Sequence, residues 1–170
     1  MTRFKILLFL LFFGTMGVFA QTAKEDNVTT YLKSNGSMQQ YEFAYDQLLK
    51  MMQKKHPKTD ANAEGWKYLK DNKSKAVSEM LGSLGTIYKK HFSDADIKEM
   101  LGFYRSAAAK QMLKDRTKMT EEHKAQLNSY YNSEIGKKII SKQQVLGQEI
   151  AKISEEWSRD LYETAVSLVK

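Results

Sequence analysis

The sequence predicts an all-α protein: a helical bundle with a tandem pair of similar helical units and a long C-terminal helix. Three observations support this fold class. Pro57 is the only proline, and no β-branched run bounded by turn residues marks a strand. Apolar residues recur at helical spacing through most of the chain. Segments 92–113 and 119–140 align without a gap, and such internal similarity identifies a repeated structural unit. We expect about six helices.

The first twenty residues have the layout of a secretory signal peptide. Arg3 and Lys5 precede an apolar run over 6–13, and small residues precede a cleavage site after Ala20. The apolar span is about fifteen residues, shorter than the roughly 20 that a membrane-spanning helix needs. We therefore expect a periplasmic or extracellular protein that is soluble after cleavage and has no integral membrane segment.

Composition limits the reactions that this chain can carry out and the partners that it can bind. The chain has no cysteine, which excludes disulfides and thiol nucleophiles. Between Lys50 and Lys90, ten lysines accompany four acids. A segment with this excess of lysine either attracts anionic polymers or lipid head groups, or its lysines simply cover exposed helix faces. We expect no nucleic-acid partner, because the chain carries an export signal and no base-reading motif.

The mature chain begins with a lead-in over 21–36, followed by a single helical domain over 37–170. The lead-in contains a short helix over 28–33. Ser37 is expected to cap a second helix, whose apolar stripe includes Tyr41, Leu48 and Met52. This helix ends just before Pro57, because a residue that precedes proline is pushed out of helical geometry.

The next helix is expected to run unbroken from about residue 62 to Lys90, with Trp66 and Leu69 in its apolar stripe. Gly82 and Gly85 lie inside it, and each costs about 1 kcal/mol of helix stability relative to alanine. Either another helix approaches closely at these glycines, or they mark a weak point.

Each repeat unit starts with a capping residue, Ser93 or Thr120, followed by acids that favour the positive end of a helix. An aromatic pair follows, and a serine two residues later (Ser106 or Ser133) is expected to end the helix by competing for its backbone hydrogen bonds. In the second unit the chain then continues as one amphipathic helix from Glu134 to the C-terminus, about 50 Å long at 1.5 Å per residue.

The aromatic pairs have two open interpretations. They are either core residues or the floor of a groove between the units, rimmed by basic residues that include Lys110 and Lys138. Lys124 and Asn128 replace Ile97 and Leu101 of the first unit, so we expect the second unit to be the more exposed one and to meet a partner. The candidate contact residues are therefore Phe103, Tyr104, Arg105, Lys124, Asn128, Tyr130, Tyr131 and Lys137.

Residues suited to catalysis are sparse. His56, His91 and His123 show no spacing that places two imidazoles on one helix face. No nucleophile elbow, phosphate-binding glycine loop or dinucleotide motif is present. We predict no catalytic residue, no metal and no cofactor. A metal-assisted hydrolase built from His91, His123 and neighbouring acids is the least favoured alternative.

The repeat carries a family resemblance. The segment from His91 to Ile97 with Phe103-Tyr104-Arg105-Ser106, and the weaker second copy from Tyr130 to Lys138, resemble an exported bacterial family catalogued as domain of unknown function twenty fifty-nine. The resemblance covers about residues 41–142. It implies an all-helical envelope protein, and it implies no activity and no functional residue.

The function expected from the sequence is that of an exported, non-enzymatic module that binds an envelope protein or an anionic surface polymer. The alternative is a small-ligand binder that uses the aromatic groove. A homo-oligomer is also compatible with the sequence.

Overall fold

The computed structural model describes residues 25–170, in which eight α-helices and no strands occur, so the all-α prediction is confirmed. The predicted signal peptide lies outside the described residues. The helices are α1 (Asn27–Ser34), α2 (Ser37–Lys55), α3 (Ala63–Asp71), α4 (Lys73–His91), α5 (Asp94–Tyr104), α6 (Ala107–Lys114), α7 (Glu121–Asn132) and α8 (Glu134–Val169), with 3₁₀ turns η1 (Asp60–Asn62) and η2 (Arg116–Lys118).

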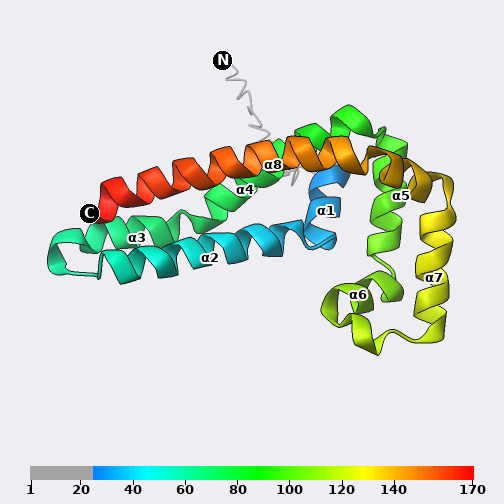
Figure 1. Cartoon of the computed structure of the whole chain (residues 1–170), viewed down its shortest axis with the longest axis horizontal. Helices are drawn as coiled ribbons and strands as arrows, with labels where there is room; N and C mark the ends of the chain where they lie inside the picture. Colours follow the sequence, from blue (N-terminus) through cyan, green and yellow to red (C-terminus); the bar gives the residue numbers. More distant parts are fainter. Residues whose placement is uncertain (1–24) are drawn as a thin grey trace, which may run out of the picture.

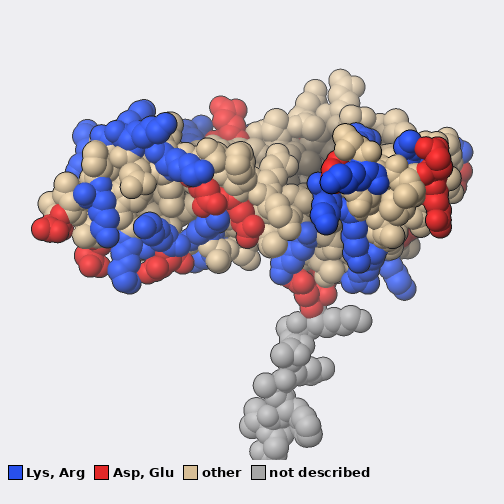
Figure 2. All heavy atoms as spheres, turned by 90° about the horizontal axis from the view of Figure 1, so that it is seen from below, with Lys and Arg blue, Asp and Glu red and all other residues tan. Residues whose placement is uncertain are grey.

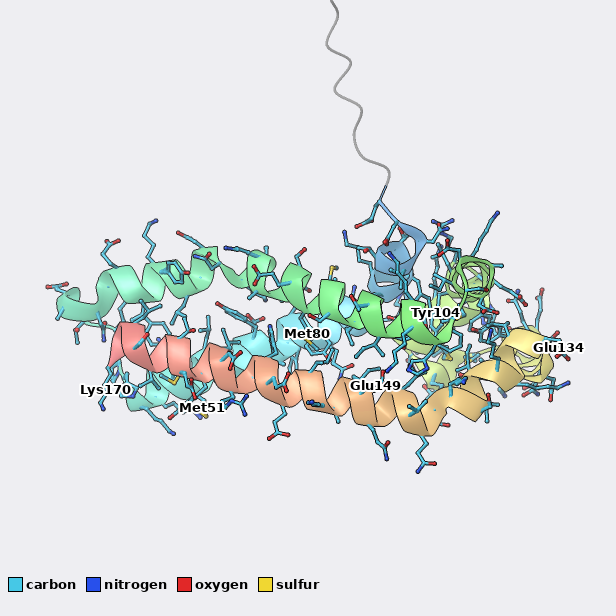
Figure 3. All side chains as sticks on the ribbon, turned by 90° about the horizontal axis from the view of Figure 1, so that it is seen from above. Met51, Met80, Tyr104, Glu134, Glu149 and Lys170 are labelled. Carbon is cyan, nitrogen blue, oxygen red and sulfur yellow. The ribbon has the colours of Figure 1, made fainter. Side chains whose placement is uncertain are left out.

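The molecule is elongated (Figure 1). Helices α2, α3, α4 and α8 run along one long half, and α5, α6 and α7 form the other end. Helix α8 continues the second repeat unit and then extends along the long half, with Glu134 and Lys170 at opposite ends (Figure 3). Its 36 residues make it about 54 Å long at 1.5 Å per residue, as predicted. No helix within residues 25–170 combines the length and hydropathy of a membrane span.

Helix α1 belongs to the core. Asp26 caps it by accepting a hydrogen bond from the Thr29 amide at 2.8 Å, and Val28, Tyr31 and Leu32 are buried against α4 and α5. A β-carbon placed on Gly85 would lie 3.2 Å from Cγ1 of Val28, which is the close approach expected at that glycine. The folded unit therefore begins before residue 37, the boundary predicted from the sequence.

Two predicted helix ends are wrong. Gly36, with a φ of 91°, takes the N-cap position of α2 in place of Ser37, because the tight α1–α2 turn requires a left-handed backbone. The helix predicted over 62–90 breaks at Asn72, whose side-chain amide donates to the Tyr68 carbonyl at 3.0 Å. An asparagine side chain that bonds to a nearby backbone carbonyl offers the chain an alternative to continuing the helix. This break and the separate short helices raise the count above the six expected.

The apolar residues form two clusters. The larger one joins every helix except α3. The smaller one lies at the far end of the long half, where α2, α3 and the last turns of α8 meet. At that end the Asn62 side chain donates to the Val169 carbonyl at 3.1 Å, satisfying a free carbonyl at the end of α8. The buried residues of the smaller cluster are Met52, Trp66, Leu69, Ala165 and Val169.

Candidate functional site

The repeat units begin as the sequence predicts. The Ser93 hydroxyl accepts from the Asp96 amide at 3.2 Å, and an Asp96 carboxylate oxygen accepts from the Ser93 amide at 2.7 Å. Thr120 and His123 form the same reciprocal pair. Asp96 also binds the Lys138 ammonium at 2.5 Å, and this contact lowers the pKa of the carboxyl. The cap of the first unit therefore uses an acid and that of the second a histidine, and Asp96 also ties α5 to α8.

Ser106 and Ser133 act differently from the prediction. Each is the N-cap of the following helix: their hydroxyls accept from the amides of Ala109 and Gly136, both at 3.2 Å. The Ser133 hydroxyl also donates to the Tyr130 carbonyl at 2.6 Å, whereas Ser106 bonds to the helix before it through its backbone amide, at 2.9 Å from the Phe103 carbonyl. A β-carbon on Gly136 would lie 2.2 Å from the Tyr130 carbonyl oxygen, which explains why the second unit has glycine where the first has Ala109.

The aromatic pairs meet in a packed seam. The rings of Phe103 and Tyr130 stack across the two units with centroids 3.8 Å apart and planes 3° apart. The Tyr104 ring packs edge-on against Phe103, with centroids 5.3 Å apart. The Tyr131 ring is tilted against Tyr130, with centroids 5.5 Å apart. Phe103 and Tyr130 are both buried. The rings fill the space that the predicted groove would occupy, so the core interpretation is correct for Phe103 and Tyr130.

The seam continues into a larger group of tyrosines. Tyr104 contacts Tyr31 at 5.5 Å between ring centroids, and Tyr31 contacts Tyr88 at 5.3 Å. Burial raises the pKa of Tyr104 to about 12 and raises those of Tyr31 and Tyr88. Burial also raises the pKa of Tyr130 far above its usual range, and its hydroxyl has no hydrogen-bond partner among the described residues. These phenols remain neutral and serve packing.

The polar candidates do not converge on a common site. Lys124 pairs with Glu121 at 2.6 Å, Lys137 pairs with Glu134 at 3.4 Å, and Arg105 and Asn128 are exposed. The second unit is nevertheless the more exposed one, as expected: α5 buries four side chains and α7 buries one. The last apolar positions of the units, Leu113 and Ile140, also stay exposed, at 46% and 54%.

His91 and His123 have separate structural partners. Nε2 of His91 lies 3.0 Å from a carboxylate oxygen of Glu149, and the Lys90 ammonium binds the other oxygen at 2.6 Å. The hydrogen bonds from Lys90, which has the larger effect, and from His91 lower the pKa of the Glu149 carboxyl. His123 belongs to the cap of α7. Residues 25–170 contain no group of three or more His, Asp or Glu side chains placed to hold a metal ion.

A basic groove lies between α2 and α3, away from the repeat. We call it the lysine groove; its volume is about 240 Å³. Trp66 lines it and is only 3% exposed, and its indole Nε1 has no hydrogen-bond partner among the described residues. The lysine surplus of this half pointed to the region, but no sequence signal brought the lining residues together: Asp46, Leu49, Lys50, Gln53, Lys58, Trp66 and Lys70.

A second groove, of about 270 Å³, lies near the α3–α4 break and is lined by the aromatic residues Tyr45, Tyr68 and Trp157. Here the fold already uses the polar atoms of two of the rings. The Tyr45 hydroxyl donates to the Leu69 carbonyl at 2.6 Å, and the Trp157 indole donates to the Ala76 carbonyl at 3.2 Å. The lysine groove, whose three lysines form no ion pair among the described residues, is the better candidate for binding.

These features define a class of protein: an all-α chain with two consecutive capped helical pairs, the second extended into a long helix. Residues 78–128 and 116–163 match the family described as "Uncharacterized protein conserved in bacteria (DUF2059)", and each match contains one aromatic pair. Together they span just over half of the chain, which belongs to this family. The matches begin later and end later than the resemblance predicted over 41–142. No curated protein and no solved structure shows significant similarity to the chain.

Proposed function

We propose that this chain is a non-enzymatic module exported to the bacterial envelope, where it binds an anionic surface polymer through its lysine-rich end. This lysine-rich end is the surface of residues 50–70, from the last turns of α2 to the end of α3. It carries six lysines and two acids. Basic side chains cover much of it in the left-hand part of Figure 2. This concentration of charge is the observation that carries the proposal.

The lysines at this end are mostly without acidic partners. Within residues 25–170, only Lys67 of the six forms an ion pair, with Asp71 at 3.0 Å. The other five are exposed and form none: Lys50, Lys54, Lys55, Lys58 and Lys70. Their charge is therefore available to an external polyanion, and a surface of one sign raises both the local concentration and the association rate of such a partner.

Retention on immobilised dextran sulfate, compared with uncharged dextran, tests the proposal. The chain from Gln21 onward should be retained on the sulfated polymer, and glutamine substitutions at Lys50, Lys54, Lys55 and Lys58 should abolish most of the retention. The matched control removes the same charge from the rest of the molecule, by substitutions to glutamine at Lys98, Lys110, Lys114 and Lys142, which also form no ion pair within the described residues. The control variant should stay bound.

Two results would contradict the proposal. Equal loss of retention in both variants would mean that net charge, and not the lysine-rich end, drives the interaction. Absence of retention of the unsubstituted chain would remove the polymer as a partner. Circular dichroism of each variant checks that the helical fold persists. We expect it to persist, because exposed lysine side chains contribute little to stability.

A protein of the envelope is the second candidate partner. It is favoured by the exposure of Leu113 and Ile140, which occupy equivalent positions in the two repeat units. Crosslinking in the native envelope should yield a defined protein adduct, and serine substitutions at both positions should remove it. An unchanged adduct would exclude this surface.

A further inference from the structure

We infer that helix α2 docks on a bilayer of anionic lipid: Phe43 and Met51 enter the lipid surface, and neighbouring lysines bind the head groups. The docking surface, which we call the amphipathic face, consists of Phe43, Gln47, Lys50, Met51 and Lys54. Helix α2 lies along one edge of the long half (Figure 1), and Met51 lies at the same end of the molecule as the C-terminus (Figure 3). This inference goes beyond the proposed function, because a bilayer, unlike a polymer, also receives apolar side chains.

The five side chains of the amphipathic face share one side of α2. Each residue of an α-helix adds about 100° of rotation, so Lys50 and Met51 bound an arc of about 100° that contains the other three. All five are exposed. Gln47, Lys50, Met51 and Lys54 also line one depression of the surface, so their side chains are neighbours in space.

Phe43 and Met51 distinguish this face from an ordinary basic surface. Phe43 is 64% exposed, more than any other large hydrophobic side chain within residues 25–170, and Met51 is 38% exposed. Neither belongs to the two apolar clusters. Tyr162 of α8 extends the exposed apolar surface, since the Lys55 ammonium lies 5.8 Å from the centroid of its ring. Exposed apolar side chains beside lysines are typical of a helix that lies in the surface of a membrane.

The charges on the amphipathic face are all positive. Lys50 and Lys54 form no ion pair within the described residues. Asp46 lies outside the arc and pairs with Lys73, which donates to both of its carboxylate oxygens at 2.8 Å. Glu42, the other acid of α2, also lies outside the arc. The lysines are therefore free to attract anionic head groups, as basic residues near a membrane surface do.

The combination of apolar and basic side chains favours lipid over other occupants. A hydrated polyanion would satisfy the lysines but would offer Phe43 and Met51 no apolar surroundings. A second copy of the chain would place the same positive face against itself, and like charges repel. A bilayer that contains anionic lipid offers both head groups for the lysines and acyl chains for the apolar side chains.

Flotation with lipid vesicles tests the inference. The chain from Gln21 onward contains α1 to α8 but not the apolar run over 6–13, which would insert independently. It should float with vesicles of equal parts phosphatidylglycerol and phosphatidylcholine, and not with phosphatidylcholine alone. Phe43→Ser with Met51→Ser should weaken binding by about tenfold or more, because less apolar area is transferred to lipid.

The matched control is Leu113→Ser with Ile140→Ser, which removes two apolar side chains of similar exposure, 46% and 54%, from outside the amphipathic face. It should bind within about twofold of the unsubstituted chain. Lys50→Gln with Lys54→Gln should weaken binding as well, because attraction to the head groups is lost. Equal weakening by the two serine variants, or by neither of them, would overturn the inference. Circular dichroism checks that each variant keeps its helices.

The absence of cysteine permits a readout at a chosen position. In the variant Gln47→Cys, an environment-sensitive fluorophore would sit between Phe43 and Met51, and its emission should shift to shorter wavelength when phosphatidylglycerol vesicles are added. Gln126→Cys is the control, an exposed position of α7 at the other end of the molecule (Figure 1), and its emission should not shift. An unmoved emission at position 47, or equal shifts at both positions, would overturn the inference.

The outcome also separates this inference from the proposed function. If dextran sulfate retains the chain and vesicles do not bind it, the lysine-rich end binds polyanions and the lipid inference fails. If vesicles bind the chain and dextran sulfate does not retain it, the amphipathic face binds lipid and the proposed polymer function fails. A dimer in sedimentation equilibrium that Phe43→Ser with Met51→Ser dissociates would assign the face to a second copy and would also overturn the inference.

Discussion

The backbone of Leu168 lies directly against Gly65: a β-carbon on residue 65 would stand 2.1 Å from the Leu168 carbonyl oxygen and 2.8 Å from the carbonyl carbon. The contact joins α3 to the last turn of α8, next to the hydrogen bond from Asn62 to Val169. Neither backbone can yield as a flexible side chain would. Glycine at position 65 is therefore a requirement of how the C-terminus docks.

Gly65→Ala should destabilise the protein by about 1–3 kcal/mol, the usual range for overpacking a close contact. The control is Gly82→Ala in α4, where no atom lies within 4 Å of the added β-carbon. That substitution should stabilise by about 0.5–1 kcal/mol, because alanine is the better helix former. Urea unfolding measures both free energies, and changes of the same sign would contradict the described packing.

Tyr130→Phe should stabilise the protein, by about 1 kcal/mol, because it removes a buried hydroxyl that has no partner among residues 25–170. The stacked ring against Phe103 is retained. Tyr45→Phe is the matched control, since the Tyr45 hydroxyl donates to the Leu69 carbonyl at 2.6 Å. Its removal should cost about 1 kcal/mol. Thermal unfolding would show opposite shifts of Tm, and a lower Tm for Tyr130→Phe would refute the prediction.

Asp26 should contribute stability that depends on pH. Its contact with Lys89 and its capping bond to Thr29 lower its pKa from 3.8 to about 2. The folded state then binds fewer protons than the unfolded state between these values. The contribution is fully present above about pH 4 and is lost as pH falls toward 2.

Asp26→Asn keeps a good N-cap but removes the charge that pairs with Lys89. Since both side chains are half exposed, at 48%, the loss at pH 7 should be only about 0.5 kcal/mol. Urea unfolding at several pH values should show a shallower fall in stability below pH 4 for the variant. Identical pH profiles for the variant and the unsubstituted chain would exclude the pairing.

Binding to dextran sulfate should weaken steeply with salt if the lysine-rich end acts through exposed charges. The Debye length falls from about 10 Å at 0.1 M to about 3 Å at 1 M ionic strength, so separated lysines cease to act together. Elution in a salt gradient measures this directly. Retention that is insensitive to salt would point to apolar contacts such as those available at Leu113 and Ile140.

Features set by local contacts could be predicted from the sequence. The caps at Ser93 and Thr120 depend on residues three positions apart, and the continuity of α8 depends on a periodic apolar stripe. The break at Asn72 was missed because the apolar stripe continues across it and only a side-chain bond to Tyr68 reveals it. Gly36 was missed as a cap because a serine, the usual capping residue, follows it.

The candidate site depended on tertiary contacts, and the sequence could not resolve it. Whether Phe103 and Tyr130 face a groove or each other is decided by how α5 and α7 pack, which no spacing reveals. The lysine groove combines residues from α2 and α3 that become neighbours only when the chain turns back near Pro57. The missing partner of Trp66 is likewise visible only once the indole is buried.

The reach of α8 also bears on the order in which the chain can fold. The last turns of α8 supply Ala165 and Val169 to the cluster that buries Trp66 and Met52, so this end lacks part of its packing until the final residues arrive. A chain led by the export signal predicted here crosses the membrane N-terminus first. If that predicted signal directs export, the lysine-rich end would lack part of its packing until the last turns of α8 have followed it across the membrane.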